Sequence, residues 1–201
     1  MKNILLAYAT LLFTCVTLAQ TTFTSTQYKF SMLEPANWIP ADRETLDKNA
    51  HKLDLSEKEI DDMLQKQKKA VSLMSYFKYN IKGHPGLIPA INVDVRNNPA
   101  KDFASLKKGL EGSLSVLQKT FPDAEYIHKP SETVVGGQKC IYFSIRYTVH
   151  MNDGQMVLKT KCRSYIIPYR NYLFRINLID GQTEEDCTTE FDDLIKSIKI
   201  G

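Results

Sequence analysis

The chain has 201 residues, 26 Lys and Arg against 23 Asp and Glu, and a formal net charge of +3. This near balance excludes the strongly basic surface that nucleic-acid-binding proteins use, and gives no reason to expect electrostatic binding to membranes. A hydrophobic content of 43% is that of a globular chain and excludes an intrinsically disordered protein.

The first twenty residues have the layout of a secretory signal peptide. Lys2 precedes the apolar run of residues 4–14, and the small residues Thr17 and Ala19 follow. The run is too short to span a bilayer, which takes about 20 residues. We expect cleavage after Ala19 and export of residues 20–201 to the periplasm or the extracellular space. The mature chain then has a net charge of +2, because Lys2 is lost, and no transmembrane segment.

Cys15 raises the alternative of a lipid-anchored protein, but lipoprotein signals usually have Gly, Ala or Ser before the cysteine. Thr14 stands there, which favours ordinary cleavage. The mature chain keeps Cys140, Cys162 and Cys187, so at most one internal disulfide can form. Cys162 and Cys187 lie on predicted buried faces and would be the pair; two free, buried thiols are the alternative.

The N-terminal part predicts a strand over residues 27–33 and then a turn around the only Trp, Trp38. Ser56 to Glu59 form a capping box, in which the Ser hydroxyl and the Glu carboxylate each satisfy a free backbone N–H. A helix is therefore expected over about 57–70.

The middle of the chain predicts strands over 72–80 and 91–96. A helix follows from Pro99 to Phe121, because apolar residues recur there at steps of three and four. Pro122 ends that helix.

The C-terminal third predicts three strands and a helix. Residues 139–149 and 156–167 alternate and flank an Asp-Gly turn, so they form a hairpin in which Ile145 faces Cys162. A second turn, of three residues within 168–171, leads to a strand over 172–179. Thr183 then caps the last helix.

Three groups of residues in this order resemble the PsbP-like superfamily, which includes extrinsic photosystem II proteins, LpqN lipoproteins and exported bacterial proteins. They lie in the opening strand and turn, before a long strand, and in the closing helix: Tyr28, Phe30, Pro35 and Trp38; residues 134–137; Phe191, Ile195, Ser197, Ile198 and Ile200. The resemblance spans most of residues 23–200.

This resemblance implies one α+β domain over residues 20–201, with an antiparallel β-sheet flanked by helices in an α/β/α sandwich. Members of the superfamily mostly bind or assemble rather than catalyse. The extra segment around residues 41–70 and the lack of a matching ligand set mean that no functional residue carries over, and a photosystem role is not implied.

The residues themselves offer no catalytic, metal or cofactor signature. The four His have no metal-ligand spacing with one another or with Cys, and no nucleophile motif occurs. We therefore expect a non-enzymatic binding or accessory protein of the cell envelope. The alternative is an envelope hydrolase, or another enzyme, whose site is assembled from distant residues.

One sheet face is a candidate partner-binding surface for a protein or an anionic small molecule. The predicted register places Arg146 opposite Lys161, a like-charge pair that costs stability unless an acidic group answers it. Arg and Tyr together suit the recognition of anions or protein partners. The alternative is an ordinary polar sheet face. The residues expected in one patch are Tyr142, Arg146, Arg163, Tyr165 and Arg175.

Overall fold

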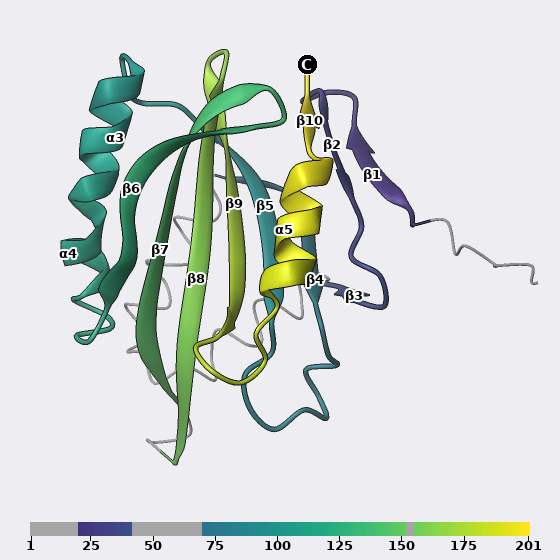
Figure 1. Ribbon diagram of the computed structural model, residues 1–201, viewed down its shortest axis with the longest axis vertical. Helices are drawn as coiled ribbons and strands as arrows, with labels where there is room; N and C mark the ends of the chain where they lie inside the picture. Colours follow the sequence, from purple (N-terminus) through teal and green to yellow (C-terminus); the bar gives the residue numbers. More distant parts are fainter. Residues whose placement is uncertain (1–19, 42–69, 152–154) are drawn as a thin grey trace, which may run out of the picture.

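Two antiparallel sheets organise the protein, whose computed structural model describes residues 20–41, 70–151 and 155–201 (Figure 1). The large sheet has seven strands within these ranges, and its last four strands in chain order are joined by short hairpins. Their spatial order is β3 (Ile39–Pro40), β4 (Val71–Phe77), β5 (Ala90–Asn97), β9 (Tyr172–Gly181), β8 (Met156–Tyr169), β7 (Gln138–Met151) and β6 (Glu125–Val135).

The small sheet joins the beginning and the end of the described chain. Its order is β1 (Thr22–Ser25), β2 (Phe30–Leu33) and β10 (Lys199–Ile200). Phe30 pairs with Ile200, and Ser31 pairs with Lys199. These contacts span nearly the whole sequence.

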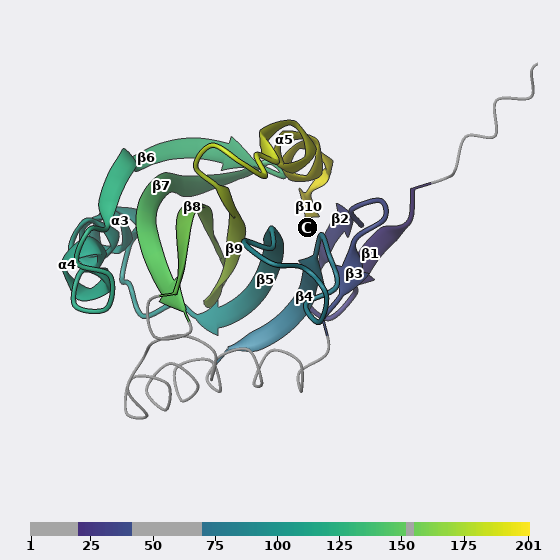
Figure 2. The ribbon, with the colours of Figure 1, turned by 90° about the horizontal axis from the view of Figure 1, so that it is seen from below.

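Helices lie against both faces of the large sheet (Figure 2). α5 (Thr188–Ser197) packs on the face that we call the α5 face, and α3 (Phe103–Glu111) packs on the opposite one, the α3 face. The short α4 (Ser113–Leu117) continues from α3. This arrangement is an α+β fold with an antiparallel sheet flanked by helices, as predicted.

The main core lies on the α5 face. Phe174 of β9 contacts Phe30 of the small sheet with ring centres 5.1 Å apart, and Phe191 of α5 contacts Trp38 at 6.0 Å. Alternate residues of a strand share a face, so the β9 residues Phe174, Ile176 and Leu178 all enter this core. A smaller cluster on the α3 face holds Leu106, Ile141, Ile166 and Leu173.

Several predicted boundaries move because of local backbone chemistry. The strand predicted over residues 27–33 is β2, which begins at Phe30 because Lys29 takes a positive φ of 52°. The helix predicted from Pro99 begins at Phe103, because Asp102 caps it by accepting from Ser105 N–H, and the first helical segment ends before Gly112. The last helix begins at Thr188 rather than after Thr183.

The predicted pairing of β7 with β8 is confirmed, including Ile145 opposite Cys162. The predicted three-residue turn between β8 and β9 is wrong. Tyr169 pairs with Tyr172, so only two residues form that turn, and Arg170 takes a positive φ of 56° to close it. A change of one residue moves every side chain of a strand to the other face.

Two strands were not predicted, and several predictions concern residues that the structure does not describe. β1 and β6 were not predicted as strands. The signal peptide, Cys15, the helix over about 57–70 and the centre of the Asp-Gly turn lie outside the described residues. None of the helices in the described ranges is long and apolar enough to cross a membrane.

Candidate binding pocket at the start of α5

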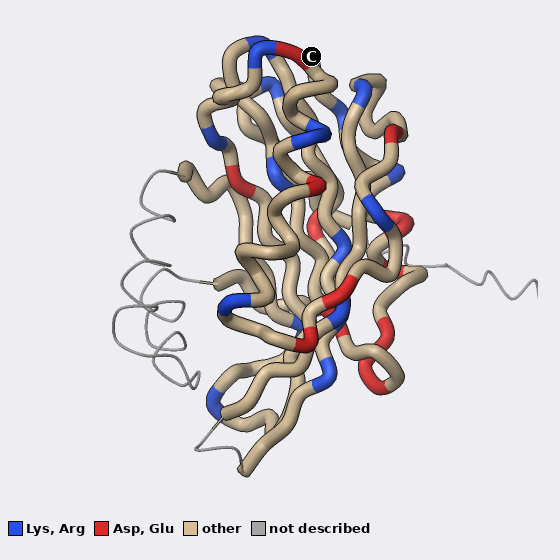
Figure 3. Tube along the Cα trace, turned by 90° about the vertical axis from the view of Figure 1, so that its left-hand side faces the viewer, with Lys and Arg blue, Asp and Glu red and all other residues tan. Residues whose placement is uncertain are grey.

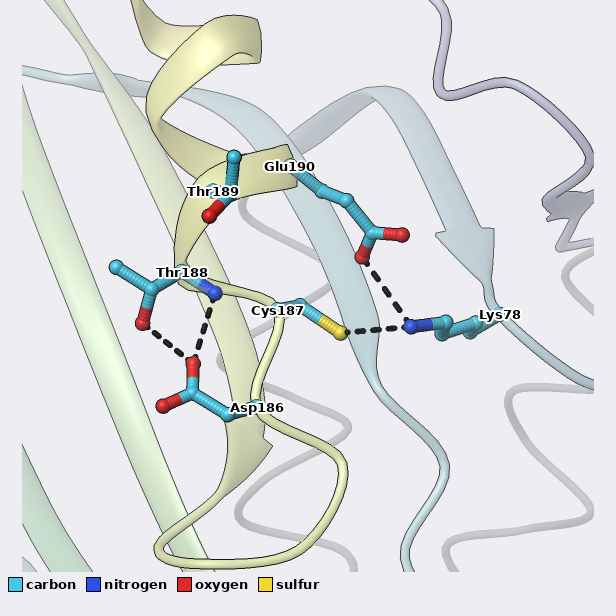
Figure 4. A pocket seen from close by; sticks show the side chains of 6 residues that line it. All are labelled: Lys78, Asp186, Cys187, Thr188, Thr189 and Glu190. Carbon is cyan, nitrogen blue, oxygen red and sulfur yellow. Dashed lines mark hydrogen bonds and ion pairs between the residues drawn. The ribbon is translucent and has the colours of Figure 1, made fainter.

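A pocket of about 400 Å³ opens where α5 begins (Figure 4). One side is formed by Lys78, which directly follows β4, and the other by residues 186–190, which lead into α5. Lys78 is partly buried, whereas Asp186, Thr188 and Glu190 are exposed. The pocket is thus built from two segments that the fold brings together from distant parts of the sequence.

Gly181 lets the chain turn back from β9 toward α5. A Cβ atom at this position would lie 1.7 Å from the carbonyl oxygen of Glu184, far inside van der Waals contact. The turn is also held by Tyr79, whose hydroxyl donates to Oε2 of Glu185 at 2.7 Å. Only glycine fits this close approach, which places the following residues beside Lys78.

A buried ion pair beneath the pocket fixes the first turn of α5. Asp180 is fully buried, and its Oδ2 atom accepts hydrogen bonds of 2.9 Å from Nη1 of Arg163 and from the backbone N–H of Cys187. A helix start leaves its first N–H groups without intrahelical partners. Arg163 is 8% exposed; it also donates to Oγ1 of Thr188 and lies 5.4 Å from the ring centre of Phe191. This pair therefore ties β8, β9 and α5 together.

The charged groups that line the pocket all have partners within the protein. Nζ of Lys78 donates to Sγ of Cys187 at 3.3 Å and to Oε2 of Glu190 at 3.2 Å (Figure 4). Asp186 accepts from the backbone N–H of Thr188 at 2.8 Å and from its hydroxyl. Each contact orients a polar group at the pocket without exhausting its capacity to bond a ligand.

Three of these groups have pKa values far from neutrality. Burial raises the pKa of the Cys187 thiol to about 12. Hydrogen bonds from Thr188 hold the pKa of Asp186 down at about 2. Burial lowers the pKa of Lys78, but hydrogen bonds to Cys187 and Glu190 outweigh it, so the pKa lies above its ordinary value. The thiol is therefore protonated, and Lys78 and Asp186 are charged, across the whole neutral range.

Four of the five residues predicted as one binding patch belong to β7 and β8. Tyr142 pairs with Tyr165, their rings 4.8 Å apart, and both are partly buried on the α5 face. Arg163 lies on the same face but is buried in its ion pair with Asp180. Arg163 is thus an internal anchor rather than part of an open surface.

Arg146 lies opposite Lys161 as predicted, and each of the two cations forms ion pairs with carboxylates of the protein itself. Nε of Arg146 donates to Oε1 of Glu125 at 2.6 Å. Lys161 lies 3.3 Å from Asp186 and 3.7 Å from Asp180. The like-charge pair therefore does not require an external anion.

Arg175, the fifth residue, lies on the α3 face and pairs with Asp94. The two-residue turn of the β8–β9 hairpin places Ile166, rather than Tyr165, opposite Arg175. The hypothesis of a single patch that contains Arg146, Arg163 and Arg175 is therefore wrong. Binding of a partner by the individual side chains stays a prediction.

The three cysteines of the described chain are buried and free. Cys187 contributes to the main core on the α5 face, as does Cys140. Cys162 pairs with Ile145 and Ile179 and lies on the α3 face. A Cys162–Cys187 bridge does not form because the sheet separates the two thiols, and the alternative of free, buried thiols is confirmed.

Sequence reasoning missed the pocket, because its parts lie far apart along the chain. One signal was present: Asp180 follows the apolar alternation of a strand, and Gly181 comes directly after it. An acid at the end of a buried strand needs a partner. That requirement points to Arg163, but not to Lys78.

The fold of this chain is similar to that of solved PsbP and LpqN structures. No family model matches the sequence, and no curated protein matches it. The solution structure of cyanobacterial PsbP (CyanoP) from Synechocystis sp. PCC 6803 is similar at a TM-score of 0.54 and 15% identity, covering 93% of this chain and 96% of that one. LpqN of Mycobacterium tuberculosis, described as involved in cell envelope biogenesis, is similar at a TM-score of 0.50 and 12% identity, covering 90% and 85%. At these identities the likeness concerns the fold.

Proposed function

We propose that the protein is exported and acts in the cell envelope as a non-enzymatic binding or accessory protein, with the pocket at the start of α5 as its contact site. The observation that carries this proposal is the fixed charge of the pocket. Lys78 stays positive and Asp186 negative at neutral pH, and the thiol of Cys187 stays protonated.

These charge states suit binding better than catalysis. A general acid or base works best with a pKa near the working pH, where it can both take up and release a proton. A nucleophilic cysteine must be a thiolate, and Cys187 is 1% exposed with a pKa of about 12. Lys78, Asp186 and Cys187 therefore offer fixed charges and hydrogen bonds instead of proton transfer.

The pocket fits a polar partner that presents both donors and acceptors. It offers the ammonium group of Lys78, the hydroxyl groups of Thr188 and Thr189, and the carboxylates of Asp186 and Glu190. Basic and acidic positions are also interspersed along the side of the molecule shown in Figure 3. A protein surface carries such mixed groups, so a protein is the kind of partner that we propose.

Export is supported by the tripartite pattern of residues 1–20. LpqN, which has a similar fold, is described as involved in cell envelope biogenesis. Intact-mass measurement of the secreted or periplasmic protein tests this part. We expect the mass of residues 20–201; a mass that retains residues 1–19, or acyl chains on Cys15, would contradict it.

Capture of a partner from a solubilised envelope fraction tests the pocket. The wild-type protein should retain a partner saturably, and Lys78→Ala should lose it. Lys196→Ala is the matched control, because Lys196 lies in the last turn of α5, is exposed, and pairs among the described residues only with Asp193. Equal retention by both variants would rule out the pocket as the contact site. Conversion of an envelope component by the wild-type protein would rule out the non-enzymatic function.

A further inference from the structure

The α3 face of the large sheet carries a row of paired polar side chains, on the side opposite the pocket. Asn92 of β5 and Asn177 of β9 are direct cross-strand neighbours. The hydroxyl of Ser75 donates to Oδ1 of Asn92, and the hydroxyl of Ser164 donates to Oδ1 of Asn177 at 2.9 Å. Each serine thus occupies the carbonyl oxygen of an asparagine and fixes its amide.

The two amide nitrogens are left as donors. Within the part of the chain that the structure describes, neither Nδ2 of Asn92 nor Nδ2 of Asn177 donates to a protein acceptor. Both residues are partly rather than fully buried. An amide nitrogen carries two N–H groups. The two asparagines therefore have unused N–H donors, whereas their carbonyl oxygens already accept hydrogen bonds from serine.

The next two rows on the same face carry two guanidinium groups and one carboxylate: Asp94 lies opposite Arg175, and Arg96 lies one row further along β5, opposite Leu173. Oδ2 of Asp94 accepts from Nε and Nη2 of Arg175 at 3.0 and 2.6 Å, and Oδ1 accepts from Nε of Arg96 at 2.7 Å. Asp94 is 7% exposed, whereas the side chains of Arg96 and Arg175 are 28% and 30% exposed. Both carboxylate oxygens are used, and the cluster keeps one positive charge.

Each arginine also keeps N–H groups that Asp94 does not use. Arginine has five donors, and these contacts involve only Nε of Arg96 and Nε with Nη2 of Arg175. Burial and the positive charge of Arg96 lower the pKa of Arg175, against the opposing effect of Asp94. A negative charge placed beside Arg175 would offset both the desolvation of its guanidinium group and the repulsion from Arg96.

We propose that these three rows form a binding site for a small oxyanion, a phosphate, sulfate or carboxylate group. The guanidinium groups of Arg96 and Arg175 would bind the anion, since their planar fork matches its oxygens. Positions two residues apart along a strand are about 7 Å apart. The amides of Asn92 and Asn177 lie one row from Arg175, and Arg96 reaches back to Asp94 from the row beyond, so all four side chains would contact one ligand. The site is separate from the α5 pocket, so this proposal does not depend on the proposed function of that pocket.

Titration of the full chain with inorganic phosphate, and separately with sodium acetate, tests the site. We expect saturable shifts of the side-chain amide resonances of Asn92 and Asn177 in ¹H–¹⁵N spectra. Binding of phosphate alone would indicate a tetrahedral oxyanion, and binding of acetate alone a carboxylate. The absence of saturable shifts with both anions would overturn the proposal.

Matched variants then separate the site from general attraction of anions. Arg96→Gln should weaken binding about tenfold or more, because it removes charge-assisted hydrogen bonds. Arg146→Gln changes the net charge equally, on an exposed residue paired with Glu125, and should leave binding unchanged. Equal weakening by both variants would overturn the proposal. Should Arg96→Gln fail to fold, Asn177→Asp, which replaces two donors by a negative charge, should abolish the amide shifts of Asn92.

Discussion

Asp180→Asn removes the carboxylate that pairs with Arg163 beneath α5, and we expect this substitution to destabilise the protein. Asp180 is fully buried and the side chain of Arg163 is 9% exposed. Without Asp180, Arg163 keeps among the described carboxylates only a 3.7 Å contact with that of the half-exposed Asp186. Leaving a buried charge without its close partner costs about 3–5 kcal/mol. For a domain of this length each kcal/mol lowers the Tm by about 2–4 °C, so the expected fall is about 6–20 °C.

Urea unfolding and thermal unfolding monitored by circular dichroism measure this effect. Glu125→Gln is the control: it breaks the ion pair with Arg146, whose side chains are 55% and 53% exposed. An exposed pair contributes only about 0–1 kcal/mol. The double variant Arg163→Met, Asp180→Leu should be much less destabilised than the sum of the two single changes, because no charge is left unpaired.

The reasoning would be refuted by an Asp180→Asn variant that loses no more stability than Glu125→Gln. It would also be refuted if the effects of the single changes at Arg163 and Asp180 simply added. Burial raises the pKa of Asp180 although Arg163 and Lys161 oppose the rise, so desolvation of the carboxylate offsets part of its attraction to Arg163, and the lower end of the range is expected for Asp180→Asn.

Three further predictions concern the pocket. Asp186 has a folded-state pKa of about 2 against an ordinary 3.8, so its contribution to stability is present above about pH 4 and is lost between pH 4 and 2; Asp186→Asn should reduce that loss in urea unfolding across this range. Half-exposure of Asp186 keeps this effect small, and an unchanged pH profile would contradict it. Gly181→Ala should lower the Tm and abolish partner capture, since its Cβ would meet the carbonyl oxygen of Glu184; a variant with wild-type Tm would show that the loop relaxes freely. Cys187 should react with iodoacetamide only after unfolding, as peptide mapping would show, and rapid native labelling at pH 8 would contradict its burial and its pKa of about 12.

Local patterns predicted most of the strands, because alternation and turn chemistry act over a few residues. They could not decide which face of the sheet holds the main core. β8 carries Ile166 and Ile167 next to each other, 4% and 0% exposed, one on each face. Because β8 has apolar residues on both faces, its own sequence does not show which residues of β9 share the face of the main core. That depends on the length of the turn after β8, where Arg170 takes a backbone conformation that arginine rarely adopts.

The same limit applies to function. Tyr142 and Tyr165 were correctly placed as neighbours, since one hairpin determines their register. The pocket combines Lys78 with residues 186–190, and no local rule joins segments that far apart. The burial of Arg163 likewise depends on where α5 packs, which is a tertiary property.

The pairing of β2 with β10 has a consequence for when the protein can fold. Residues 30 and 31 pair with residues 200 and 199, so the small sheet cannot be completed until residues 199 and 200 have been synthesised. Contacts between distant residues form slowly, because a long loop must close first. A chain exported as we propose would therefore stay incompletely folded during synthesis, and the final register of its ends would be set after translocation.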